Sequence, residues 1–149
     1  MQYDNSRRIL KSTVSKKLTP ILKEYNVDAN LYIVGDILAL CIDQGPIDFI
    51  GNYTEIYKQR QLISTLAGGN SFRYVDHFDY PGDTYLSNRC NFNIDRNFSG
   101  LAREFLTKVR TLVDDMWRPY PNETWGPALN IFIGDEAHPY RFVPNKELA

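Results

Sequence analysis

An amphipathic pattern between Ser99 and Met116 constrains this chain more than any other feature of its sequence. The apolar residues recur at the spacing of one helical face, and they are Leu101, Phe105, Val109, Leu112, Val113 and Met116. Ser99 is a suitable N-cap, and Pro119 ends the pattern. Because a helix with one apolar face is stable only against another apolar layer, the rest of the chain must supply that layer.

Runs rich in β-forming residues can supply this second layer. Two runs, LYIV and ILALCI, lie within residues 30–42 and are separated by Gly35-Asp36, which predicts a β-hairpin. Alternation of apolar and polar residues predicts a further strand at 89–94, and another apolar run predicts the last strand at 128–133. The hairpin leaves no room for crossover connections, so we expect an antiparallel sheet.

Two further helices complete the predicted fold. The first begins at Asn5 or Ser6 and carries an apolar stripe to Tyr25, with a kink or a restart at Pro20, and the second covers residues 54–67. We expect residues 47–50 to be a short strand or an extended loop, and residues 70–88 to be mostly loop with a short strand at 72–75. The sequence therefore predicts one α+β domain over residues 1–149, with its core at about 6–143. It contains four to five antiparallel strands and about three helices.

Composition excludes several classes of protein. The formal net charge of −1 removes the general electrostatic attraction on which non-specific nucleic-acid binding depends. No segment approaches the roughly 18 apolar residues of a membrane span, and the first residues lack the apolar core of a secretory signal. We therefore expect a cytosolic protein that does not bind membranes. Cys41 and Cys90 fall in strand-like runs and are expected to be core residues rather than a disulfide.

Catalytic motifs are missing from the sequence, so we expect neither a catalytic residue nor a cofactor. There is no Gly-rich nucleotide fingerprint, and no Ser or Cys lies in a nucleophile-elbow pattern. One segment leaves enzymatic activity open, because Asp76, His77, Asp79 and Asp83 combine carboxylates with an imidazole that could hold a metal ion. The alternative is a turn in which the carboxylates cap their own backbone. His138, beside Asp135 and Glu136, is a weaker candidate and is expected to be a loop residue.

Aromatic residues make up 13% of the chain and suggest a contact surface. The candidate partner-binding residues are Ile50, Tyr53, Tyr57, Tyr80, Tyr85 and Tyr140. In an extended segment Ile50 would face away from Ile47 and Phe49, so either a helix covers it or it stays exposed to a partner or a second copy. Small cores also bury tyrosines, which is the alternative. A nucleotide ligand could instead be held by the candidate phosphate contacts Arg73, Arg89, Arg96 and Arg141.

Three loose motifs resemble those of a family of small phage and mobile-element proteins that are related in layout to large polyvalent protein-associated domains. They are Gly45-Pro-Ile-Asp-Phe-Ile-Gly-Asn-Tyr53; Asn91 to Asn93 with Phe98-Ser99-Gly100; and Ile133-Gly134 with Pro139-Tyr140. The resemblance covers most of residues 7–142 and implies no catalytic residue.

The resemblance implies a role in counter-defence or host takeover. We accordingly expect a non-catalytic accessory protein that binds and blocks a host protein, such as a defence effector or a nuclease complex. One alternative is a sponge that sequesters a nucleotide-derived immune signal. The other is a metal-dependent hydrolase that uses the Asp76, His77 and Asp79 segment. Assembly of the chain into a homo-oligomer is a further alternative.

Overall fold

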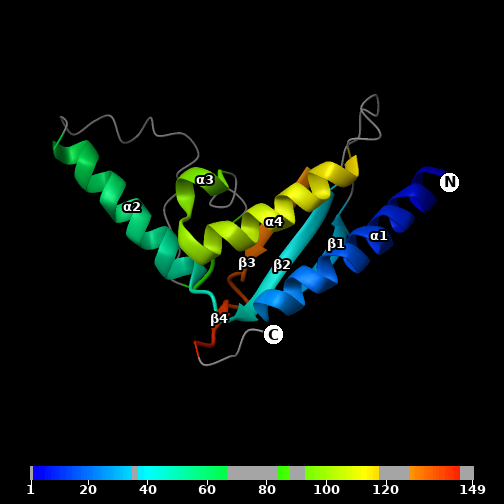
Figure 1. Ribbon diagram of the computed structural model, residues 1–149, viewed down its shortest axis with the longest axis horizontal. Helices are drawn as coiled ribbons and strands as arrows, with labels where there is room; N and C mark the ends of the chain where they lie inside the picture. The colour runs from blue at the N-terminus through cyan, green and yellow to red at the C-terminus, as the bar shows by residue number, and fades with distance from the viewer. Residues whose placement is uncertain (1, 35–36, 67–83, 88–92, 118–127, 145–149) are drawn as a thin grey trace.

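The chain forms one α+β domain, as the sequence predicts. The computed structural model describes residues 2–34, 37–66, 84–87, 93–117 and 128–144 (Figure 1). The helices are α1 (Gln2–Tyr25), α2 (Phe49–Leu66), the short α3 (Ile94–Asn97) and α4 (Gly100–Trp117). The strands are β1 (Asp28–Val34), β2 (Ile37–Gly45), β3 (Ala128–Ile133) and β4 (Arg141–Phe142).

The sheet is mixed, with β2 at its centre. β1 pairs antiparallel with β2 as the predicted hairpin, whereas β3 and β4 both pair parallel with β2. The expectation of a wholly antiparallel sheet is therefore wrong. The connection from β2 to β3 passes through α2, α3 and α4, and so long a connection allows the chain to enter β3 in the same direction as β2.

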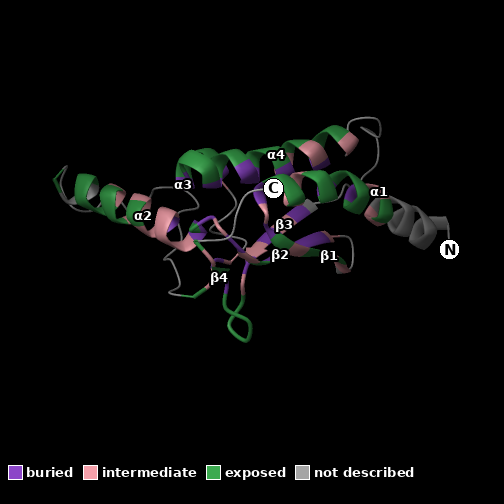
Figure 2. Ribbon diagram, turned by 60° about the horizontal axis from the view of Figure 1, so that its bottom comes forward, coloured by how far each residue is buried: buried purple, intermediate pink, exposed green. Residues whose placement is uncertain are grey.

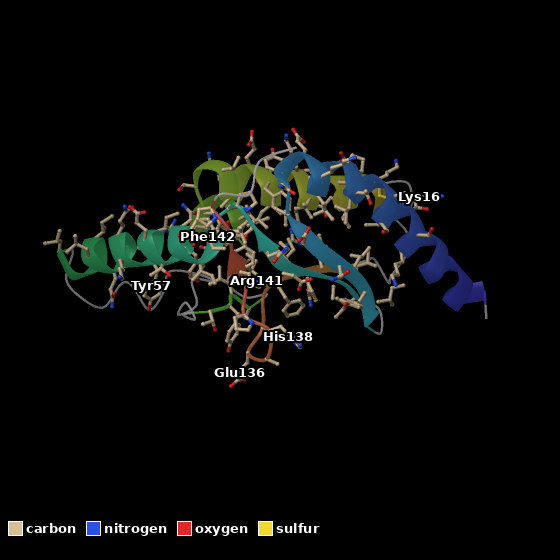
Figure 3. The ribbon with its side chains drawn as sticks, turned by 90° about the horizontal axis from the view of Figure 1, so that it is seen from below. Lys16, Tyr57, Glu136, His138, Arg141 and Phe142 are labelled. Carbon is tan, nitrogen blue, oxygen red and sulfur yellow. The ribbon has the colours of Figure 1, made fainter. Side chains whose placement is uncertain are left out.

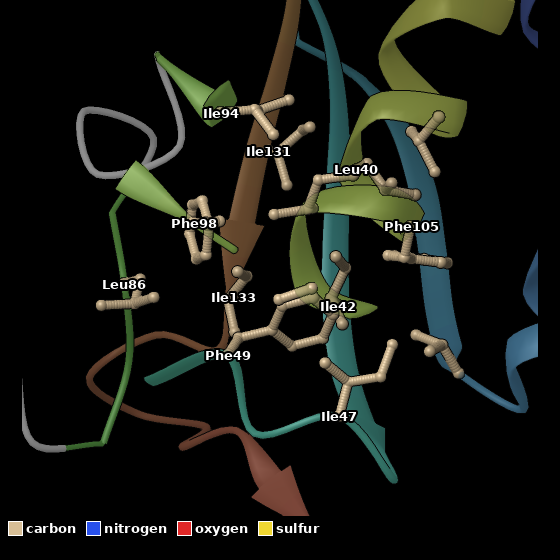
Figure 4. Close-up of a cluster of buried hydrophobic side chains, with 14 of the residues drawn as sticks. Leu40, Ile42, Ile47, Phe49, Leu86, Ile94, Phe98, Phe105, Ile131 and Ile133 are labelled. Carbon is tan, nitrogen blue, oxygen red and sulfur yellow. The ribbon is translucent and has the colours of Figure 1, made fainter. Parts of the chain in front are cut away.

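Two layers enclose the core. α1 and α4 lie over one face of the sheet (Figure 2), and the residues of β2 and β3 that face them are at most 4% exposed. In β2 and β3 these residues are Leu38, Leu40, Ile42, Leu129, Ile131 and Ile133. Figure 4 shows Leu40, Ile42, Ile131 and Ile133 among them. From α4, Phe105, Leu106, Val109 and Val113 complete the cluster. The stripe predicted for residues 99–116 is thus the helical side of the core, although Leu101 is exposed.

Several local predictions need correction. Phe49 and Ile50 begin α2 instead of extending a strand or loop, and Ile94 begins α3 instead of ending a strand. α1 begins at Gln2 and continues through Pro20 without a restart. The rest of the strand predicted at 89–94, apart from Asn93, and the strand predicted at 72–75 lie outside the described residues.

None of the helices in the described part of the chain is both long enough and apolar enough to cross a bilayer.

Candidate docking surface

Asp48 organises the first turn of α2. Its Oδ1 accepts a hydrogen bond from the Gly51 amide at 3.0 Å, and its carbonyl accepts one from the Asn52 amide at 3.0 Å. A side-chain acceptor just before a helix satisfies an amide that would otherwise have no partner in the helix. The Asp-Phe-Ile-Gly part of the first motif is therefore a helix start. Asp48 was the signal that could have predicted it.

Asn52 joins the first motif to the second. Its side-chain amide donates to Ser99 Oγ at 2.8 Å, and its Oδ1 accepts from the Ser99 amide at 3.0 Å. Ser99 stands at the start of α4, where its carbonyl accepts from the Arg103 amide at 3.2 Å. One asparagine in α2 thus fixes where α4 begins.

Tyr140 joins the third motif to the first. Its hydroxyl donates to the Ile47 carbonyl at 2.7 Å, and its ring packs edge-on against Phe49, with ring centroids 5.5 Å apart. Burial, and to a lesser extent the charge of Asp48, raises the pKa of this hydroxyl well above its ordinary value. Segments 45–53, 98–100 and 133–140 therefore meet in one place, which we call the motif junction.

Two of the tyrosines expected to bind a partner are buried in the motif junction. Tyr53 is fully buried, with its ring centroid 5.6 Å from that of Phe98, and Tyr140 is 7% exposed. Both belong to the core, so a partner at the surface cannot reach them. Ile50 and Tyr57 are half-buried and pack against the core, which agrees with the alternative that this segment is structural. Tyr85 is half-buried, and Tyr80 lies outside the described residues.

Of the six large apolar side chains that are exposed in the described part of the chain, the three most exposed lie further along α2. The helix runs outward from the motif junction and extends beyond α3 (Figure 1). Its first turn is buried through Phe49 and Tyr53, but its last turns carry three large apolar side chains that are 61–79% exposed. These three residues, Leu62, Ile63 and Leu66, are called the α2 tip. The predicted limit of this helix at residue 67 is within one residue of its observed end at Leu66.

Two of the four predicted phosphate contacts belong to the described part of the chain, and they lie on different elements. Arg141 in β4 (Figure 3) and Arg96 in α3 are both exposed, and Arg73 and Arg89 lie outside the described residues. Arg60 donates to the Arg96 carbonyl at 2.9 Å, and burial followed by the charge of Arg96 lowers the pKa of Arg60. An open surface depression of about 330 Å³ lies elsewhere, on α1, and is lined by Lys11, Ser12, Ser15 and Lys16.

The segment 135–138 is a self-contained turn that projects from the sheet (Figure 3). Asp135 Oδ1 accepts from the His138 amide at 2.6 Å, and the His138 carbonyl accepts from the Asp135 amide at 2.8 Å. The hydrogen bond from the His138 amide is the main reason that the pKa of Asp135 is lowered. These contacts shape an exposed turn, in which Nδ1 of His138 also lies 3.3 Å from Asp135 Oδ1.

The remaining candidate groups are side chains that could bind a metal ion or act as a nucleophile. Within the described residues no three His, Cys, Asp or Glu side chains are grouped so that they could hold a metal ion. Asp76, His77, Asp79 and Asp83 lie outside that part of the chain. Cys41 is a half-buried free thiol, and burial followed by the charges of Asp43 and Asp135 raises its pKa. A raised pKa lowers the thiolate fraction and makes Cys41 a poor nucleophile.

Comparison of the chain with protein-family models, curated proteins and solved structures found no match.

Proposed function

We propose that this chain is a non-catalytic binding protein that blocks a host protein by inserting the α2 tip into an apolar groove of its target. It acts in the host cytosol as a phage or mobile-element accessory protein. The target class is a defence effector or a nuclease complex. The sequence resemblance supports this biological setting, and the geometry of α2 supports the mode of binding.

One observation carries the proposal: α2 is anchored at one end and apolar at its free end. Leu62 and Leu66 are four residues apart and Ile63 and Leu66 are three apart, so they lie on neighbouring parts of one helical surface. This spacing is the one by which helices dock into grooves. Full burial of such a side chain stabilises a complex by about 1.5–3 kcal/mol, which is comparable to a binding hot spot.

Affinity capture with matched variants tests the proposal. The tip variant carries Leu62→Asp and Leu66→Asp, and the control carries Thr107→Asp and Thr111→Asp on the exposed side of α4. Both add two carboxylates four residues apart on an exposed helical surface. The target must be recovered from host lysate by wild type and by the control but not by the tip variant.

The recovered protein is then purified, and its affinity for each form is measured by calorimetry. We expect the tip variant to bind at least tenfold more weakly than the control, since about 1.4 kcal/mol corresponds to tenfold. Equal affinities would show that the α2 tip is not the docking element. Failure to recover any tip-dependent protein would also contradict the proposal.

A further inference from the structure

Among the described strands, the outer edge of β1 is a second surface to which a partner could bind. Within the described strands the sheet order is β1-β2-β3, so β1 is paired on one side only. The opposite edge of the sheet is already engaged, because Leu86 and Ile133 exchange backbone hydrogen bonds of 2.8 and 3.1 Å. β4 has two residues, whereas β1 has seven. β1 therefore offers the longest edge to which another strand could add.

The composition of β1 does not protect this edge. Natural sheets block edge pairing with lysine, proline or inward-pointing charges. β1 reads DANLYIV, and its one charge is Asp28, at the end where the pairing with β2 is irregular. The remaining six residues are uncharged and alternate regularly, which is the pattern that an added strand can match.

Burial along β1 shows that the apolar layer is incomplete there. Leu31 and Ile33 lie on the helix-covered face and pack against the core, yet each is only half-buried. The corresponding side chains of β2 and β3 are at most 4% exposed. On the other face, Tyr32 is 49% exposed. A strand added beside β1 would cover Leu31 and Ile33 from the side that lacks a neighbour.

From these observations we infer that β1 binds an extended segment of a partner protein by strand addition. The bound segment carries apolar side chains at alternate positions, which extend the apolar face at Leu31 and Ile33. Its backbone pairs with that of β1. This surface is separate from the α2 tip and does not depend on it.

The position of α1 favours a single extended segment over a second copy of the chain. α1 lies alongside β1 on the helix-covered side of the sheet (Figures 1 and 2). Antiparallel pairing of two β1 strands would require a two-fold axis perpendicular to the sheet, which brings both α1 helices to the same side of the junction. An isolated strand brings no such helix.

A designed peptide tests the inference. The probe is the octapeptide KTVTVTVK, which alternates valine with threonine, and the control has the same sequence with its central residues N-methylated to remove hydrogen-bond donors. NMR of the isotope-labelled full chain follows each backbone amide during titration and during hydrogen exchange. We expect shifts centred on β1 and slower exchange of alternate β1 amides with the probe, and neither change with the control.

Two variants test whether the probe binds at the edge of β1. Leu31→Thr retains a β-forming residue but removes apolar contact, and it should weaken probe binding about tenfold. The tip variant with Leu62→Asp and Leu66→Asp should bind the probe like wild type. Three results would overturn the inference: no binding at millimolar probe, shifts centred outside β1, or concentration-dependent self-association of the free chain through β1.

Discussion

Gly51 packs closely against the Asp48 carboxylate, a contact that the sequence alone does not reveal. A Cβ at position 51 would overlap the carboxylate of Asp48, the group that caps the first turn of α2. A glycine followed by an asparagine commonly marks a turn or a break in regular structure. Here the glycine lies inside a helix and leaves room for its cap, so its small size matters more than its flexibility.

This packing predicts strong coupling between the two residues. Gly51→Ala in wild type should change the free energy of unfolding little, because a gain in helix propensity of about 0.5–1 kcal/mol offsets a displaced cap worth about 1 kcal/mol. In the Asp48→Ala background the same substitution should stabilise by about 0.5–1 kcal/mol, since no cap remains to be displaced. Urea denaturation of the four proteins measures the coupling, and additive effects would rule out the competition.

Tyr140 should contribute to stability mainly through its hydroxyl. Tyr140→Phe preserves the ring contacts with Phe49 but leaves the Ile47 carbonyl without this donor, which should cost about 1–3 kcal/mol. Tyr32→Phe is the matched control, because its ring is about half exposed, and it should cost under about 0.5 kcal/mol. Urea denaturation at pH 8 compares the two variants, and equal costs would contradict the role of the buried bond.

The same hydroxyl should make stability depend on alkaline pH. The folded state raises its pKa, whereas in the unfolded chain the hydroxyl loses its proton near pH 10. The contribution of Tyr140 is therefore complete below about pH 10 and declines as the pH rises further. The stability difference between wild type and Tyr140→Phe should shrink by about 1 kcal/mol from pH 8 to pH 11. An unchanged difference would show that the hydroxyl titrates normally.

At the scale of elements, α4 was the most predictable part of the fold. Its apolar stripe is long and regular, and Phe105, Val109 and Val113 are buried as that stripe predicts. The hairpin and β3 were equally predictable from the sequence, because their runs of β-forming residues have clear limits. α2 was harder to predict because its apolar residues are spread around the helix and only its first turns are packed. In such a helix, burial depends on where the neighbouring elements end, which local periodicity does not record.

The register of α4 can be tested with one buried and one exposed position. Val109→Asp places an uncompensated carboxylate in the core and should destabilise the fold by about 3–5 kcal/mol. Thr111→Asp, on the exposed side, should cost under about 0.5 kcal/mol. Thr111 is a better control than Lys108, whose ammonium lies 3.6 Å from Glu24 and 5.0 Å from the centre of the Tyr25 ring. Similar thermal midpoints for the two variants would disprove the helical phase.

At the scale of the whole molecule, the topology could not be predicted from local patterns. Nothing within residues 128–133 indicates which strand they join or in which direction, because parallel pairing with β2 depends on how α2, α3 and α4 return the chain. The candidate docking surface was missed for a related reason. Sequence analysis placed it near Ile50 and Tyr53, where apolar residues are dense, but that density forms the motif junction, and the exposed residues lie at the α2 tip.

This topology predicts that the C-terminal region is indispensable for folding. A chain ending at residue 127 lacks β3, β4 and Tyr140, and therefore loses the neighbour on one side of β2. It should show no dispersed amide spectrum and no cooperative thermal transition. A chain ending at residue 144 keeps every described element and should fold. Cooperative unfolding of the shorter chain would mean that the parallel strands are accessory.

The position of β2 at the centre of the sheet also affects how the protein is made. More than 80 residues separate the end of β2 from the start of β3, so a ribosome working at about 5–20 residues per second takes about 4–16 s to provide the missing neighbour. During that time the hairpin formed by β1 and β2 exposes an apolar edge in a crowded cell. Nascent chains on one mRNA are therefore most prone to aggregate through the exposed edge of β2 before β3 is synthesised.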